Sequence, residues 1–138
     1  MKRYEQFSHT SDIGVRVYGK DLRELFENAA FAMFDVIADL ENISGDKEEV
    51  IELEAQDRDM LLVSWLDELL YKFYTKGLIF YKFQVELLTE YKLQAKAFAR
   101  PVAANRNRLK TEIKAVTYSG LKIINSDAGY EVEIIFDV

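Results

Sequence analysis

DLRELFENAAFAMFDVIAD, residues 21–39, predicts a long amphipathic helix and is the stretch from which the fold class follows. Its apolar residues recur at steps of three and four, which places them on one broad helical face. They are Leu22, Leu25, Phe26, Ala29, Ala30, Met33, Phe34 and Ile37. Asp21 is a suitable N-cap, and Glu24 three residues later resembles a capping box with Asp in place of Ser or Thr. This helix is therefore expected to pack one face against a core.

The sequence on either side predicts one further helix and several strands. The second helix runs from Asp57 to a typical ending at Lys76-Gly77, and its apolar stripe contains Trp65, an expected core anchor. Alternating apolar residues and β-branched or aromatic runs predict strands elsewhere. The predicted strands are residues 3–8, 13–19, 48–55, 78–88, 91–99, 109–118, 120–125 and 130–136. The expected fold is α+β, with two amphipathic helices packed on a largely antiparallel β-sheet.

Composition narrows the possible chemistry. A length of 138 residues predicts a single domain over residues 1–138, and 49% hydrophobic residues can supply its core. The absence of Cys excludes disulfides, thiolate metal sites and Cys nucleophiles, and a single His excludes a multi-His zinc site within one chain. The 18 basic and 24 acidic residues give a net charge of −6, which argues against wrapping nucleic acid by bulk charge.

Signals for targeting are also missing from the sequence. The first ten residues are polar and charged, so we expect no signal peptide. No apolar run approaches the ~18 residues that a membrane span needs. The expectation is a cytoplasmic protein that makes no contact with a membrane.

Two short tracts, far apart in the sequence, could carry chemistry. His9-Thr10-Ser11-Asp12 places an imidazole, two hydroxyls and a carboxylate between two predicted strands; the alternative is a turn held by side-chain-to-backbone bonds. The sequence ends in Asp137-Val138, so a side-chain carboxylate and a terminal carboxylate would adjoin on a strand end. A hard divalent cation could offset their repulsion, and the alternative is a solvated tail.

A third tract, residues 100–114, concentrates positive charge in an otherwise acidic protein. One interpretation is contact with RNA phosphate or with an acidic protein face, and the other is a solvated loop. The tract spans residues 100–114 and contains Arg100, Arg106, Arg108, Lys110 and Lys114.

The order of several motifs resembles the archease family over the whole chain. The motifs are HTSDI at 9–13 with the following Gly19, LFENAA at 25–30, LLVSWLDELLY at 61–71, EIKAVTY at 112–118 and IFDV at 135–138. The resemblance implies an α+β accessory protein that is not itself an enzyme. It implies an activator of the RtcB-type tRNA-splicing RNA ligase, which promotes ligase guanylylation and multiple turnover and broadens the nucleotides used.

The resemblance also implies the residues of the site. It assigns a divalent metal, commonly calcium, to Asp12, Asp137 and Val138, the last through main-chain or terminal oxygen. His9 is expected to orient the Asp12 loop or to contact the ligase. Lys114 would meet the ligase or its nucleotide, and its alternative is an outward strand lysine. RNA would be bound only indirectly or weakly, by a monomer or weak homo-oligomer.

Two departures from the family pattern put the role of their loops in doubt but do not touch Asp12 or Asp137, and two other functions are weighed separately. Relatives often have His where this chain has Ser119, and an acidic, glycine-containing stretch where it has residues 99–101. One alternative is a general RNA-processing chaperone that modulates tRNA-modifying enzymes. The other is a small metal-dependent hydrolase that uses Asp12, Asp137 and His9.

Overall fold

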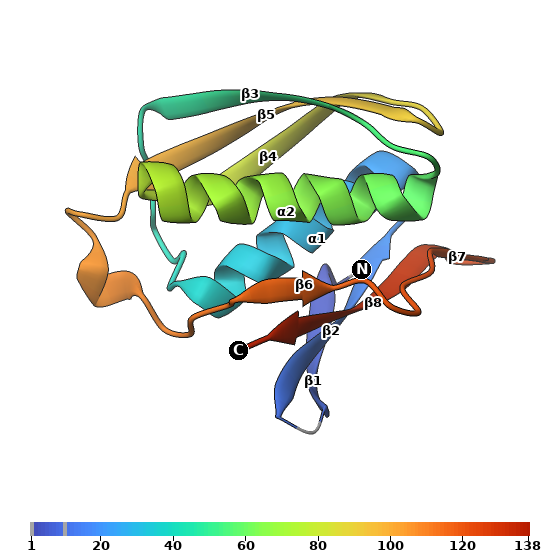
Figure 1. Ribbon diagram of the computed structural model, residues 1–138, viewed down its shortest axis with the longest axis horizontal. Coiled ribbons are helices and arrows are strands. Elements are labelled where there is room, and N and C mark those ends of the chain that lie inside the picture. Colours follow the sequence, from blue (N-terminus) through green and yellow to red (C-terminus); the bar gives the residue numbers. More distant parts are fainter. Residues whose placement is uncertain (1, 10) are drawn as a thin grey trace.

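A computed structural model describes residues 2–9 and 11–138, and Figure 1 shows its elements in chain order. The helices are α1 (Leu22–Ile37), α2 (Arg58–Lys76) and the 3-10 turn η1 (Arg106–Arg108). The strands are β1 (Tyr4–His9), β2 (Asp12–Gly19), β3 (Lys47–Glu54), β4 (Leu78–Leu88), β5 (Lys92–Pro101), β6 (Ala115–Thr117), β7 (Ile124–Ser126) and β8 (Gly129–Asp137). Thr10, part of the predicted polar tetrad, lies outside the described residues.

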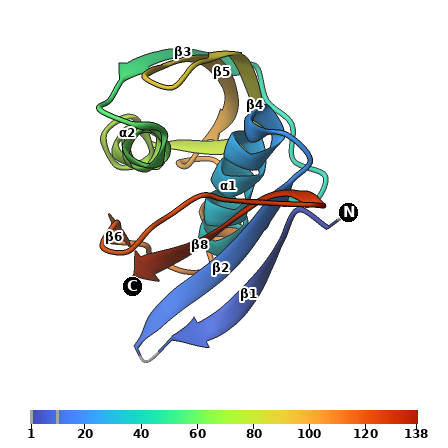
Figure 2. The ribbon, with the colours of Figure 1, turned by 90° about the vertical axis from the view of Figure 1, so that its right-hand side faces the viewer.

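The strands of the described residues form two separate antiparallel sheets. The large sheet has the order β1-β2-β8-β6, with β7 also paired to β8, and the small sheet has the order β3-β5-β4. Figure 2 shows the helices between these two sheets, with α1 running over the inner face of β2. The α+β prediction, two helices on antiparallel sheet, is confirmed.

The N-terminus of α1 is stabilised as its sequence predicts. The Asp21 carboxylate accepts a hydrogen bond of 2.9 Å from the Glu24 amide, and the Glu24 carboxylate reaches back to the Lys20 amide at 3.1 Å. The helix is buried more widely than one face, because a sheet packs on each side of it. Ala29, Ala30 and Ala32 are fully buried, and these small side chains allow the backbone of α1 to approach its neighbours closely.

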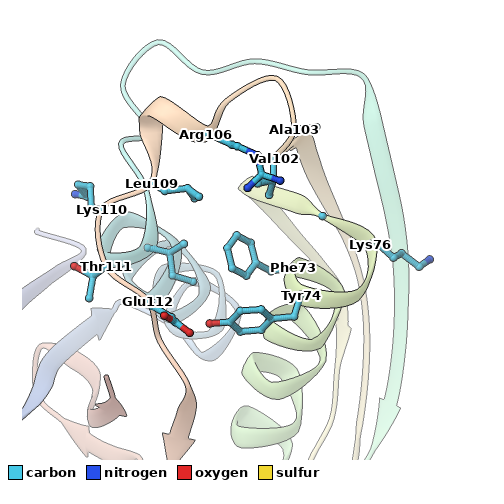
Figure 3. A pocket seen from close by; sticks show the side chains of 12 residues that line it. Phe73, Tyr74, Lys76, Val102, Ala103, Arg106, Leu109, Lys110, Thr111 and Glu112 are labelled. Carbon is cyan, nitrogen blue, oxygen red and sulfur yellow. The ribbon is translucent and has the colours of Figure 1, made fainter.

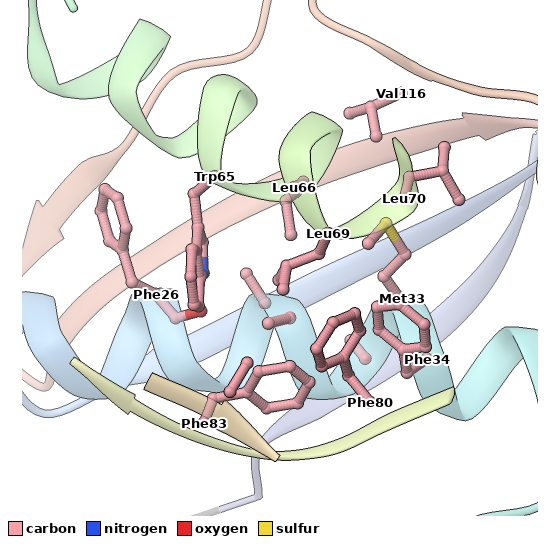
Figure 4. Packing of buried hydrophobic residues seen from close by; sticks show 14 of the residues in the cluster. Phe26, Met33, Phe34, Trp65, Leu66, Leu69, Leu70, Phe80, Phe83 and Val116 are labelled. Carbon is pink, nitrogen blue, oxygen red and sulfur yellow. The ribbon is translucent and has the colours of Figure 1, made fainter. Parts of the chain in front are cut away.

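The core lies between the two helices and the small sheet, where large aromatic rings meet edge to face (Figure 4). Trp65 of α2 is fully buried, and its indole Nε1 donates a hydrogen bond of 2.9 Å to the Phe26 carbonyl of α1. The Trp65 ring also meets Phe83 of β4 with centroids 6.2 Å apart. The prediction that Trp65 anchors the core is confirmed.

The ends of α2 also follow from its sequence. The Asp57 carboxylate accepts a hydrogen bond of 2.9 Å from the Met60 amide, which caps the first turn. Gly77 ends the helix with φ 64° and ψ 49°, a left-handed conformation in which glycine has no side-chain penalty. Of the described helices, none has the length and apolar character that crossing a bilayer would require.

Two predicted strands are mostly wrong. In residues 109–118 only Ala115–Thr117 is a strand, because the amide groups of Lys110 and Thr111 donate to the Ile37 carbonyl at the end of α1. In residues 120–125 the strand begins only at Ile124, because the Ile123 amide donates to the Asp59 carboxylate of α2 at 2.9 Å. Both segments bond to helices, and these bonds take the place of a sheet ladder.

Candidate functional site

The register of the large sheet places Asp12 and Asp137 at the same end of neighbouring strands. Ile13 of β2 pairs with Phe136 of β8, so Asp12 and Asp137 occupy the next position on each strand. His9 of β1 pairs with Asp12 across the hairpin. The predicted role of the His9 side chain lies outside what the structure describes. Residues from opposite ends of the sequence thus meet at one edge of the fold.

Lys114 adjoins this position from the other side of β8. Ala115 of β6 pairs with Asp137, and the Lys114 amide donates a hydrogen bond of 2.7 Å to the Asp137 carbonyl. The Lys114 side chain is exposed, whereas Val138 is partly buried and packs against the core. Figure 2 shows the C-terminus beside β6 at this end of β8. We call Asp12, Asp137 and Val138 together the acidic sheet end.

The donors of the acidic sheet end are oxygen atoms. Among the described residues, no group of three or more His, Cys, Asp and Glu side chains is placed to hold a metal ion. The side-chain donors here are the two carboxylates of Asp12 and Asp137, and main-chain oxygen of Val138 adjoins them. A hard divalent cation that keeps several water ligands fits such a donor set, whereas a soft metal that prefers sulfur or imidazole does not.

Comparison with known proteins shows the family of this chain. The model of the Archease protein family (MTH1598/TM1083) matches residues 4–138. The chain belongs to the archease family. A protein archease from Methanosarcina mazei is 41% identical over 141 residues, covering 99% of this chain and 97% of the relative. One from Pyrococcus abyssi is 41% identical over 126 residues, covering 89% of each.

Solved structures agree with the archease fold. The solution structure of Methanobacterium thermoautotrophicum protein 1598 matches with a TM-score of 0.88 and 35% identity over the full length of both chains. A crystal structure of a Thermotoga maritima archease, described as a possible chaperone, matches with a TM-score of 0.69. At 18% identity and 97% coverage of this chain and 96% of that one, it supports the fold alone.

A charged network that the sequence did not indicate lies on the large sheet of this archease. Arg16 of β2 is opposite Glu5 on β1 and Glu133 on β8, and its guanidinium contacts both carboxylates at 3.3 and 2.7 Å. The Tyr18 hydroxyl donates a 2.6 Å hydrogen bond to Glu5. Arg16 and Tyr18 are two residues apart on β2 and so lie on one face of the strand, but only the sheet register brings Glu5 and Glu133 next to Arg16.

Because of this network, the contribution of Glu5 to stability is expected to be lost in acid. Hydrogen bonds from the Tyr18 hydroxyl and the Lys2 ammonium lower the pKa of Glu5 from 4.5 to about 2. Because the folded-state pKa is depressed, the contribution of Glu5 to stability is present above about pH 4.5 and is lost as the pH falls towards 2. A carboxyl NMR titration should give a midpoint near 2, and Tyr18→Phe should raise it. A wild-type midpoint at the ordinary value of 4.5 would contradict the network.

The basic tract divides into structural and unpaired cations. Arg100 donates to the Ser44 carbonyl at 2.7 Å, and Arg108 donates to the carbonyls of Asp39 and Glu41 at 3.0 and 2.9 Å. These two arginines attach β5 and the 3-10 turn η1 to the loop after α1. Within the described residues, the side chains of Arg106 and Lys110 form no hydrogen bond or ion pair. Two of the five cations in this tract therefore hold the loop in place, and contact of the others with RNA phosphate stays a prediction.

Proposed function

We propose that this archease activates an RtcB-type tRNA-splicing RNA ligase by promoting its guanylylation. Faster guanylylation would sustain multiple turnover of the ligase and broaden the nucleotides that it accepts. The observation that carries the proposal is the convergence of Asp12 and Asp137 on neighbouring strands of a chain that belongs to the archease family.

In this proposal the acidic sheet end holds a divalent cation, calcium being the first candidate. Asp12 and Asp137 would supply carboxylate oxygens and Val138 main-chain or terminal oxygen. The cation would supply positive charge at the surface that meets the ligase and its nucleotide. The strands fix the positions of these donors, since the Phe136 side chain next to them is fully buried and Val138 packs on the core.

The remaining residues of this end would make the contact with the ligase. Lys114 is exposed and held beside Asp137 by the hydrogen bond from its amide, so it can reach an acidic side chain or a phosphate. The net charge of −6 complements a basic RNA-binding cleft and would speed encounter. Because the protein must leave before RNA enters, we expect a small interface that weakens with salt.

The test measures ligase-guanylate formation by a limiting amount of ligase with GTP and divalent metal, with and without this protein. Wild type should stimulate, and Asp12→Ala and Asp137→Ala should each lower the stimulation at least about tenfold, a loss of ~1.4 kcal/mol. Asp127→Ala is the matched control, because Asp127 is an exposed aspartate in the turn at the opposite end of β8. It should stimulate as wild type does.

Each contrary result has a defined meaning. No stimulation by wild type overturns the proposed function. Stimulation that survives both substitutions overturns the role of the acidic sheet end and leaves the activating function intact. Thermal unfolding of each variant shows whether a loss of stimulation reflects a loss of folding.

A further inference from the structure

A groove lies where the C-terminal ends of α1 and α2 meet the chain after β5. Its volume is about 610 Å³, within the range of ligand-binding pockets. Its walls include Ile37 of α1, Phe73 of α2, and Val102 and Leu109 of the segment 101–112. Figure 3 shows Phe73 and Leu109 pointing towards each other across this space. We call it the helix-end groove.

The walls of the helix-end groove are held in place before any ligand binds. Asn105 is buried, donates to the Pro101 carbonyl at 2.7 Å and accepts from Arg100 Nε at 3.1 Å. The Val102 amide donates to the Gly77 carbonyl at 2.8 Å, and the Lys110 amide donates to Ile37 at 2.8 Å. These bonds occupy carbonyls at the ends of both helices, so the surface left for a ligand between them is mainly apolar.

The charged side chains around the groove differ in whether they already have a partner and in whether they face the groove. Lys76 forms an ion pair with Glu49 at 2.9 Å and points away from the groove (Figure 3). Arg106 and Lys110, on the other side of the groove, form no side-chain ion pair within the described residues, and the Lys110 side chain lies at the outer rim, directed away from Phe73 (Figure 3). The acidic group facing the groove is Glu112, which lies beside the Tyr74 hydroxyl. The Tyr74 hydroxyl is itself occupied, because it donates a 2.6 Å hydrogen bond to the Ile113 carbonyl.

We propose that the helix-end groove binds an acidic segment of a partner protein. Large apolar side chains of that segment enter between Phe73 and Leu109, and its carboxylates pair with Arg106 and Lys110. Apolar anchors surrounded by complementary charge are the usual composition of a peptide-binding site. Unpaired cations beside an apolar floor favour an acidic segment over a basic one at this groove.

Nucleic acid fits this groove less well than an acidic peptide. Strand binding depends on several phosphate contacts, and the groove offers two unpaired cations with Glu112 opposing them. The inference is independent of the proposed function, because it concerns a surface separate from the acidic sheet end and its test contains no ligase.

The experiment uses the full chain and a fluorescein-labelled peptide, Asp-Glu-Leu-Phe-Asp-Glu-Leu-Phe, whose binding is measured by fluorescence anisotropy. Wild type should bind it saturably. Arg106→Glu should weaken binding at least about tenfold, and Leu109→Ser severalfold, since Leu109 is 38% exposed and can be replaced without opening the core. Lys122→Glu is the matched control, because Lys122 is an exposed cation outside the groove and its reversal changes the net charge equally. It should bind as wild type does.

Matched peptides separate the two parts of the proposal. Replacing Leu and Phe with Ser, or Asp and Glu with Lys, should each abolish saturable binding. Equal weakening by Arg106→Glu and Lys122→Glu would show bulk charge alone and overturn the inference. Displacement of the peptide by single-stranded oligouridine, or burial of the groove by self-association in sedimentation, would also overturn it. The Arg106 side chain forms no hydrogen bond or ion pair in the described structure, so Arg106→Glu is expected to fold. This variant therefore decides the test even if Leu109→Ser fails to fold.

Discussion

Trp65→Ala is expected to lower the free energy of unfolding by about 3–5 kcal/mol, the cost typical of removing a buried aromatic side chain. Trp65 is fully buried between α1, α2 and β4, so its removal leaves a cavity that three elements would have to move to fill. The Phe26 carbonyl would also lose its hydrogen bond from the indole, which measures 2.9 Å. Urea unfolding followed by circular dichroism measures the change, because the chain's single Trp is then absent.

Two variants of α2 show whether the loss comes from this site. Trp65→Phe keeps much of the apolar volume and removes the hydrogen bond, so it should cost about 1–3 kcal/mol. Tyr71→Ala changes an aromatic side chain that is 62% exposed on the same helix, and should shift stability by less than about 0.5 kcal/mol. A loss below ~1 kcal/mol for Trp65→Ala would mean that the core collapses around the missing ring.

The helices could be predicted from the sequence because the signals that define them are local. The cap at Asp21, the stripe from Leu22 to Ile37 and the left-handed Gly77 all act within one or two turns. Residues 109–114 could not be predicted in the same way. Their apolar and polar residues alternate as in a strand, but the amides of Lys110 and Thr111 donate to the Ile37 carbonyl, a partner that only the packed α1 supplies. The structural role of Arg100 and Arg108 could likewise not be predicted, since their carbonyl partners lie in a distant loop.

Asp12 and Asp137 could be proposed as site residues separately from the sequence, but their places on neighbouring strands could not be predicted. Spacing in the sequence says nothing about a contact between residue 12 and residue 137; the resemblance to archeases implied it. The sheet register explains how the two residues come to occupy neighbouring positions, because β8 ends at the edge where its antiparallel neighbour β2 begins. Calcium binding stays a prediction, as does any role of His9.

Calcium is expected to stabilise this protein through the acidic sheet end. A cation bound only by the folded state adds RT ln(1 + [L]/Kd), which is about 2.7 kcal/mol when its concentration is 100 times Kd. Asp137→Asn keeps the shape of the side chain and removes one charged donor, so calcium should no longer stabilise the variant. Thermal unfolding of wild type and of Asp137→Asn, each with calcium and with chelator, measures how much calcium stabilises the two proteins. The measurement needs no ligase.

The variant's behaviour without metal makes this prediction specific. Asp137 is exposed and its side chain forms no hydrogen bond or ion pair within the described residues, so Asp137→Asn in chelator should match wild type within about 0.5 kcal/mol. Asp127→Asn, at the opposite end of β8, should respond to calcium as wild type does. A calcium shift that is equal in all three proteins would place the cation elsewhere. A wild type that calcium does not stabilise would reduce Asp12 and Asp137 to surface charges, and ligase contact through Lys114 would then have to act without a metal.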